Sequence, residues 1–255
     1  MDNLYAIEAY NLVKRFGEIS AVEDLNLKIK TGEIYGFLGP NGAGKTTTIR
    51  MLTGTLKPTS GRVRILGFDM SLKEMEIKRN IGVVPDEPKL YENLKGKEFI
   101  EFIIDIYRLD RKKILEKARE LLSAFGIDYL DGYIGDYSHG MKQKLMVVSI
   151  LLRSPKVIFL DEPTIGLDAR SVKLLKMLLK RYSQDGSTIF MTTHILEIAE
   201  KMCDRIGIIN QGRLIAEGAL EELRRLSAEG HFSLEDVFLE LTGGEDVSSI
   251  LEGLQ

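Results

Sequence analysis

The chain has 255 residues, of which 44% are hydrophobic and 29% are charged, and its formal net charge is −3. These values are those of an ordinary folded protein, long enough for one large domain or for one domain with a smaller lobe, and they exclude a disordered or solenoid chain. Because 35 basic side chains nearly balance 38 acidic ones, no global field attracts nucleic acid, and we expect no nucleic-acid partner.

The apolar segments of the sequence are short. The most apolar continuous stretch, residues 145–152, falls far below the roughly 20 residues that span a bilayer. The first residues, MDNLYAIEAY, are acidic where a signal peptide is basic, and Cys203 has no second cysteine to pair with. We therefore expect a cytoplasmic protein.

Strand patterns dominate the beginning of the chain. Apolar and polar residues alternate at residues 25–29 and 63–65, which is the period of strands with one exposed face. Near-continuous apolar runs are typical of strands buried on both faces, and they occur at residues 33–38, 81–84, 156–160 and 187–191. Because helical patterns lie between these runs, the sequence predicts a parallel sheet covered by helices.

The middle and the end of the chain are predicted to be helical. Residues 91–153 contain helices and no convincing strand, so we expect a helical lobe inserted between strands of the main sheet. Its clearest helix ends at Gly126 and carries one apolar stripe, formed by Ile114, Leu115, Ala118, Leu121, Leu122 and Phe125.

Residues 205–218 read as a hairpin that turns at Asn210, Gln211 and Gly212. Beyond it, Ser233 is a plausible cap for the helix SLEDVFLEL. We expect a main domain over residues 1–218 and a C-terminal helical appendage over residues 219–255.

A glycine-rich loop, GPNGAGKTT, follows the strand pattern at 33–38 and precedes a helical one. It satisfies G-x-x-x-x-G-K-[ST], a pattern whose backbone N–H groups and helix N-terminus surround the phosphates of a nucleotide. Lys45 would neutralise the β- and γ-phosphates, and the Thr46 hydroxyl would bind Mg²⁺. The expected nucleotide-binding residues are Gly39, Pro40, Asn41, Gly42, Ala43, Gly44, Lys45, Thr46 and Thr47.

Two adjacent carboxylates, Asp161 and Glu162, end the buried strand pattern at 156–160. Because consecutive strand residues point in different directions, the two can divide two tasks. Asp161 would hold Mg²⁺ through water, and Glu162 would act as general base on the attacking water. By itself such a pair is more often a turn or a helix cap, but a phosphate loop needs a metal partner from a neighbouring strand.

His194 follows the strand pattern at 187–191 and two threonines. That position is the carboxyl edge of the sheet, where α/β proteins bind ligands, so His194 is a candidate catalytic residue that senses the γ-phosphate. A lone histidine is more often a simple surface or core residue.

With these motifs in this order, the sequence resembles the nucleotide-binding subunits of ATP-binding cassette (ABC) transporters over nearly its whole length. Residues 137–145, YSHGMKQKL, stand where the family carries its LSGGQ-type signature, and TIGLD (164–168) stands at its D-loop. The resemblance implies an α/β P-loop NTPase fold: a RecA-like parallel core with an antiparallel β subdomain and an inserted helical lobe. It also implies that His194 is the switch histidine and that Phe16 stacks on adenine; the alternative for Phe16 is a half-buried core aromatic.

The signature segment bears on assembly. In the family it begins a helix and binds the γ-phosphate of ATP held by the other subunit. The resemblance therefore implies a dimer, with an identical or a different ATPase subunit, in which Ser138 and Gly140 contact the partner's nucleotide. His139 and Met141 depart from the family pattern, and taken alone the segment also fits a capped amphipathic helix.

Asp86, in IGVVPDEP, occupies the position of the family's Q-loop glutamine. Aspartate also offers an oxygen to Mg²⁺, but it adds negative charge beside Asp161 and Glu162. The expected metal ligands are therefore Thr46, Asp86 and Asp161. A loop cap is the alternative role for Asp86.

Only one cassette is present, and the 93 positions from Lys45 to Ser138 leave no room for a long coiled-coil arm. SLEDVFLELTG, YSHGMKQKL and EFIEFIIDIYRL resemble ATPase subunits of exporters whose permease is a separate polypeptide. The resemblance thus implies an ATP-hydrolysing subunit that drives such a permease from the cytoplasmic face of the membrane. The alternative is a non-transport relative acting in assembly, translation or repair. A GTPase or a small-molecule kinase is disfavoured because no N-K-x-D motif is present.

Overall fold

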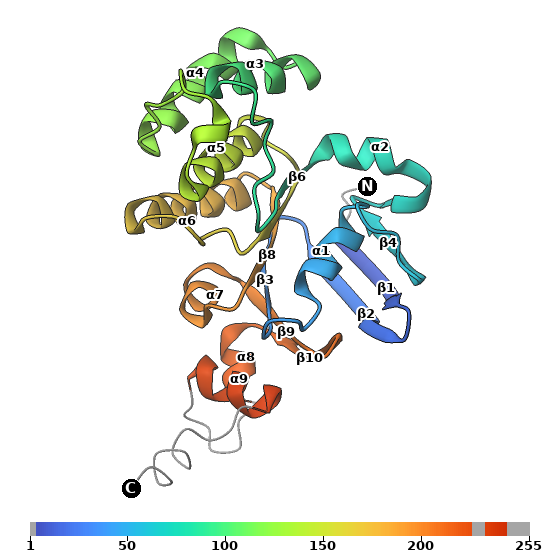
Figure 1. Ribbon diagram of the computed structural model, residues 1–255. Helices are drawn as coiled ribbons and strands as arrows, with labels where there is room; N and C mark the ends of the chain where they lie inside the picture. Colours follow the sequence, from blue (N-terminus) through green and yellow to red (C-terminus); the bar gives the residue numbers. More distant parts are fainter. Residues whose placement is uncertain (1–3, 226–232, 244–255) are drawn as a thin grey trace, which may run out of the picture.

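The computed structural model describes residues 4–225 and 233–243. Its centre is a six-stranded sheet with the order β10-β9-β3-β8-β7-β6 (Figure 1). All neighbouring pairs are parallel except β9 and β10, which form an antiparallel hairpin at one edge. The strands are β3 (Ile34–Leu38), β6 (Ile81–Val84), β7 (Val157–Asp161), β8 (Thr188–Thr193), β9 (Arg205–Asn210) and β10 (Arg213–Gly218). The predicted parallel sheet and the predicted hairpin are confirmed.

A second, antiparallel sheet has the order β2-β1-β4-β5. Leu25, Leu27 and Ile29 are buried in it while the residues between them are exposed, as their alternation predicted. Its strands are β1 (Tyr5–Phe16), β2 (Ile19–Lys30), β4 (Ser60–Ile65) and β5 (Phe68–Asp69). The expected antiparallel β subdomain is therefore present beside the parallel core.

Helices cover the sheets. α1 (Lys45–Leu52) follows β3, α2 (Met70–Asn80) lies between β5 and β6, and α6 (Ala169–Gln184) and α7 (Leu196–Met202) flank β8 in the chain. Between β6 and β7 the chain forms only helices, namely α3 (Gly96–Ile106), α4 (Arg111–Ala124), a short 3₁₀ helix (Ile134–Asp136) and α5 (His139–Leu152). Figure 1 shows α3, α4 and α5 gathered at one end of the molecule.

The helix predicted at 111–126 ends as expected. Ala118, Leu121, Leu122 and Phe125 of its stripe are buried in the large core beneath the lobe, and Gly126 has a φ of +66°, a conformation that favours glycine. Apolar periodicity and a glycine stop were therefore enough to define α4.

Two short helices end the described chain, α8 (Leu220–Arg224) and α9 (Leu234–Thr242). The Ser233 side chain accepts a hydrogen bond from the backbone N–H of Asp236, so the predicted cap is confirmed. Residues 226–232 and 244–255 of the predicted appendage lie outside the described residues. None of the helices in residues 4–225 and 233–243 is long and apolar enough to cross a membrane.

The core of the main sheet is organised around Phe190 on β8. Its ring lies 5.7 Å from Tyr35 and 5.4 Å from Phe37, both on β3, and 5.9 Å from Phe159 on β7. All four rings are fully buried. Because β8 lies between β3 and β7, this cluster fixes the relative positions of the strands that precede the phosphate loop and the acidic pair.

We predict that Phe190→Ala lowers the free energy of unfolding by about 3–5 kcal/mol, because it opens a cavity at the centre of the cluster. The matched control is Phe68→Ala on β5, where the side chain is 38% exposed. Phe68→Ala should lower the free energy of unfolding by less than about 1 kcal/mol. Chemical denaturation of the nucleotide-free protein measures both, and equal losses would contradict the assigned role of Phe190.

Candidate active site

The candidate residues meet at one edge of the main sheet. The strand order places β3, β8, β7 and β6 side by side, and because they are parallel their carboxyl ends share that edge. Gly39, His194 and Glu162 directly follow β3, β8 and β7, and Asp86 comes two residues after β6. The predicted meeting of these segments is a consequence of sheet topology.

The glycine-rich loop curls from β3 into α1 over the end of the sheet. The Lys45 ammonium donates hydrogen bonds to the carbonyls of Gly39 (2.7 Å) and Pro40 (3.2 Å) and so closes the loop on itself. Gly44 has a φ of +107°, and a Cβ there would lie 2.5 Å from the carbonyl oxygen of Ala21. The first turn of α1 has N–H groups without intrahelical acceptors, which favours an anion at this point.

Glu162 contacts both the phosphate loop, through Lys45, and His194, the residue that follows β8. Its side chain is 9% exposed, and its Oε1 lies 3.7 Å from Lys45 Nζ and 3.0 Å from His194 Nδ1. The backbone N–H of His194 also donates to Glu162 Oε2, at 3.4 Å. Glu162 itself has a φ of +48°, a left-handed conformation that a non-glycine residue adopts only where its surroundings enforce it.

Asp161 is held by a residue that the sequence analysis did not single out. The Thr192 hydroxyl on the neighbouring strand donates to Asp161 Oδ1 (2.5 Å), and it accepts from the backbone N–H of Glu162 (3.1 Å). Both side chains are buried. Thr192 therefore fixes both carboxylate-bearing residues; the available signal was a pair of threonines at the end of a buried strand.

A cleft of about 200 Å³ opens above the loop. Of the expected nucleotide-binding residues, Gly39 and Ala43 are absent from its lining, and so are Asp161, His194, Phe16, Ser138 and Gly140. Ala21 of β2 forms a wall that sequence reasoning missed. The lining consists of Ala21, Pro40, Asn41, Gly42, Gly44, Lys45, Thr46, Thr47, Asp86 and Glu162.

Phe16 lies at the end of β1, half-exposed, with the Lys14 ammonium 5.0 Å from the centre of its ring. At 50% exposure Phe16 is compatible both with a half-buried packing position and with a surface that contacts a ligand. Its stacking on a base stays a prediction.

Ser138 and Gly140 lie at the start of α5. The Ser138 hydroxyl accepts a hydrogen bond from the backbone N–H of Met141 (3.3 Å) and caps the helix. A Cβ on Gly140 would lie 2.3 Å from the carbonyl oxygen of Gly166. Lys144, one turn further, pairs with Asp168 at 2.6 Å. The tip of α5 is therefore packed against the 163–168 loop that directly follows Glu162.

Asp86 is exposed at the side of the cleft. Partial burial raises the pKa of its carboxyl, and so does the negative charge of Asp161 and Glu162, while His139 acts in the opposite direction to a smaller extent. Asp86 therefore lies within electrostatic reach of Asp161 and Glu162.

The oxygen atoms at the cleft fit Mg²⁺, which takes hard oxygen ligands. Thr46 offers a hydroxyl and Asp86 a carboxylate at the lining, and Asp161 Oδ2 forms no hydrogen bond within the described residues while Oδ1 is held by Thr192. Their roles as metal ligands stay predictions.

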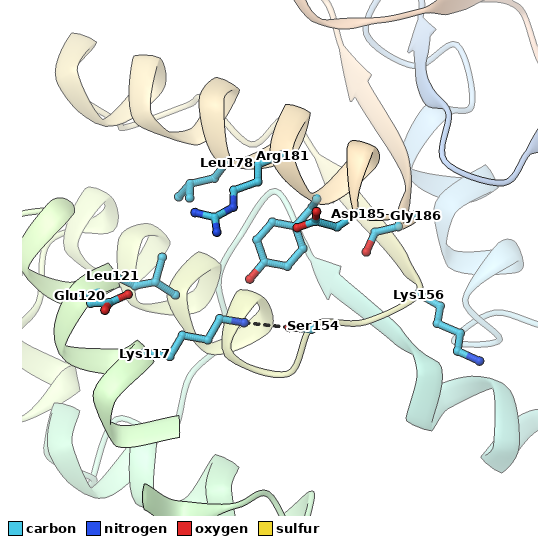
Figure 2. Close-up of a pocket in the computed structure, with 11 residues that line it drawn as sticks. Lys117, Glu120, Leu121, Ser154, Lys156, Leu178, Arg181, Asp185 and Gly186 are labelled. Carbon is cyan, nitrogen blue, oxygen red and sulfur yellow. Dashed lines mark hydrogen bonds between the residues drawn. The ribbon is translucent and has the colours of Figure 1, made fainter. Parts of the chain in front are cut away.

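A larger groove of about 600 Å³ lies elsewhere, between α4, the end of α5 and the end of α6 (Figure 2). Lys117 donates there to the carbonyl of Leu151 (2.7 Å) and to the Ser154 hydroxyl (2.8 Å), so its ammonium caps the C-terminal end of α5. Lys156 and Ser187 of this groove precede β7 and β8, which places it at the amino edge of the sheet. The smaller cleft, with the phosphate loop, is therefore the candidate active site.

The fold and the loop together define a P-loop NTPase. Comparison with known proteins gives the family: the ABC transporter family matches residues 22–165. The bacitracin transport ATP-binding protein BcrA of Bacillus licheniformis is 38% identical over 86% of this chain and 71% of its own length. A probable multidrug ABC transporter ATP-binding protein of Escherichia coli (strain K12), YbhF, is 36% identical over 92% of this chain, which spans 41% of that protein.

Solved structures of ATP-binding cassettes have the same fold as this chain. An ATP-binding subunit of an ABC transporter has a TM-score of 0.88 and 31% identity and covers 92% of this chain and 99% of its own. A dimeric ATP-binding cassette, MJ0796, bound to ADP and Pi after hydrolysis, has a TM-score of 0.74 and 28% identity over 84% of this chain and 98% of its own. The chain belongs to the ABC transporter family. It is an ATP-binding, ATP-hydrolysing subunit.

We predict that Asp86→Gln stabilises the nucleotide-free, metal-free protein at pH 8. The pKa of Asp86 is raised in the folded state, so the ionised carboxylate lowers the free energy of unfolding. This destabilisation is complete above the folded-state pKa and is lost as the carboxyl becomes protonated at lower pH. The gain in the thermal midpoint should be small, because the group is exposed, and should disappear towards pH 4.

The control is Glu116→Gln on the exposed face of α4, which removes the same charge far from the cleft. A gain for Asp86→Gln that does not change between pH 8 and pH 4 would show that the cause is not its ionisation.

Proposed function

We propose that the chain works as a dimer with a second copy of itself, binds two MgATP molecules between the copies, and drives a separate membrane permease that exports its substrate. The proposal rests on one observation: the two phosphate-binding features of the chain, the phosphate loop and the tip of α5, do not meet in one cleft. The phosphate loop and the tip of α5 both have features suited to phosphate, yet Ser138 and Gly140 do not line the cleft above the loop. A second copy can supply the missing half to each site.

In this scheme Lys45, Glu162 and His194 perform the chemistry. Glu162 orients the attacking water and accepts its proton, and its Oε1, 3.0 Å from His194 Nδ1, is already in hydrogen-bond reach of the histidine. Lys45, 3.7 Å from the same oxygen, counters charge on the γ-phosphate, and His194 contacts that phosphate from β8. When bound, Mg²⁺ neutralises charge that develops on the phosphates, with Thr46, Asp86 and Asp161 as the residues that would hold it.

Closure of the dimer is the mechanical step. ATP binds the closed state better because both the loop and the partner's helix tip contact it, and hydrolysis removes that difference. The dimeric relative with ADP and Pi supports this arrangement. A related ATPase subunit as partner is the alternative, and titration of the purified chain with MgATP separates the two.

An apolar groove of about 550 Å³ near the Asp86 loop is the surface we assign to the permease. It lies at the entrance to α3, and the rings of Tyr91 and Phe102 meet there edge to face, 5.2 Å apart. The Tyr91 side chain is 59% exposed, so the groove is open to a partner. The chain would thus sit on the cytoplasmic face of the membrane through its permease. The relatives named for bacitracin transport and multidrug transport support an exporter.

We predict that Glu162→Gln traps an ATP-bound dimer. The amide keeps the shape of the side chain but cannot accept the proton, so kcat should fall by about 10²–10⁴-fold while ATP binding persists. Size-exclusion chromatography with light scattering at saturating MgATP should give a dimer, and radiolabelled ATP should co-elute.

The matched control is Glu116→Gln on α4, which should hydrolyse ATP at the wild-type rate and show no trapped dimer. A Glu162→Gln protein that stays monomeric at saturating MgATP would contradict the scheme.

A further inference from the structure

The C-terminal helices α8 and α9 do not line the cleft. They pack against β3, β9 and α7, and β3 leads directly into the phosphate loop. Figure 1 shows them beside β9, β10 and α7. They form a separate apolar cluster with that side of the molecule, whose partly buried members include Leu196, Cys203, Phe238 and Leu241. Its buried members are Leu38, Ala199, Ile206, Ile208, Leu223 and Leu234.

Two members of this cluster are close in the chain to catalytic segments. Leu38, fully buried, is the residue directly before Gly39 and the phosphate loop. Leu196 comes two residues after His194 and opens α7. The C-terminal helices therefore pack beneath the phosphate-loop strand and the helix that continues from His194.

The helix α7 depends on packing for its position. It has only seven residues, and its N-cap, Ile195, supplies no side-chain hydrogen bond. Helices this short have little stability of their own in water. One face of α7 packs Ile198 and Met202 into the large core, and the other packs Ala199, fully buried, into the C-terminal cluster. Both faces are needed to fix it.

Polar contacts tie the same elements together. Arg224 of α8 pairs with Glu200 of α7 at 3.2 Å, and the Asn210 side-chain amide at the end of β9 donates to the carbonyl of Thr242 of α9 at 3.3 Å. Surface pairs of this kind add little stability, but they specify how the helices are aligned.

The His194 side chain is 46% exposed, and within the described residues its polar contacts are with Glu162, through Nδ1 and through the backbone N–H. Because α7 begins two residues after His194, the position of α7 also affects the direction of the ring. We propose that α8 and α9, with Phe238 among their contacts, form a positioning unit that holds α7 so that His194 faces Glu162 and the γ-phosphate. This inference rests on the catalytic roles proposed above for His194 and Glu162.

The test compares Phe238→Ala with Leu239→Ala in the full chain. Leu239 is the next residue on α9, is 36% exposed and is not part of the cluster, so it is the matched control. Phe238→Ala should lower kcat about tenfold, because small misplacements of catalytic groups cost that much or more, and leave KM for MgATP within about twofold. Phe238→Leu should restore most of kcat, and Leu239→Ala should match the wild type.

The decisive readout is the same substitution in a His194→Ala background. If Phe238 acts through His194, the double variant has the kcat of His194→Ala alone. A further tenfold loss in the double variant, or an unchanged kcat for Phe238→Ala, overturns the positioning role. An unchanged kcat for His194→Ala instead overturns the proposed catalytic role of His194, which is a separate result of the same experiment.

A second pair of variants covers the case in which Phe238→Ala does not fold. Arg224→Ala should lower kcat less, with KM unchanged, and the charge swap of Arg224→Glu with Glu200→Arg should recover it. Thermal unfolding of each protein confirms that the chain is folded at the assay temperature. Loss of kcat in the swapped protein equal to that of Arg224→Ala would contradict the role of the pair.

Discussion

The contact on which the structure depends is the one between Glu162 and its two cationic or polar neighbours, Lys45 and His194. These residues lie in three segments far apart in the sequence, and they meet because β8 stands between β3 and β7. The aromatic cluster around Phe190 fixes that strand order from within the sheet, and Thr192 fixes the end of β7 from β8. The left-handed backbone of Glu162 is a consequence of the same constraint, because its N–H is hydrogen-bonded to β8 while its side chain turns back over the loop.

The other half of the proposed site lies in the helical lobe. Ser138 and Gly140 begin α5, and Gly140 approaches the backbone of Gly166 so closely that no side chain fits between them. Since residues 163–168 directly follow Glu162, a displacement of the α5 tip by a bound nucleotide would also move the backbone next to Glu162, the proposed general base of the same chain. Lys144 and Asp168 strengthen the same contact. In the proposed dimer, one chain would thus connect its own catalytic site with the site that it completes for its partner.

Sequence reasoning predicted the parts of the site that are fixed by local chemistry. The phosphate loop, the acidic pair and His194 each follow a recognisable strand, and parallel strands bring such positions to one edge. Thr192, Ala21 and the packing of α9 against α7 were not predicted, because each depends on which strand or helix lies next to which. Alternation and apolar runs predict elements; they do not say that β8 separates β3 from β7, or that α9 packs on the helix after His194. Phe16, named from the family resemblance, lies half-exposed outside the cleft lining, and its contact with a base stays a prediction.

The measurement that tests the shared site most directly mixes two variants, each inactive alone: Lys45→Ala, which loses its own loop, and Ser138→Arg, which loses the helix tip offered to the partner. In a mixed dimer one of the two sites combines an intact loop with an intact tip. An equal mixture should therefore recover about a quarter of the wild-type ATPase rate if the two sites act independently. If the Ser138→Arg chain hydrolyses ATP at the wild-type rate by itself, or if mixing restores nothing, a site shared between two copies of this chain is contradicted.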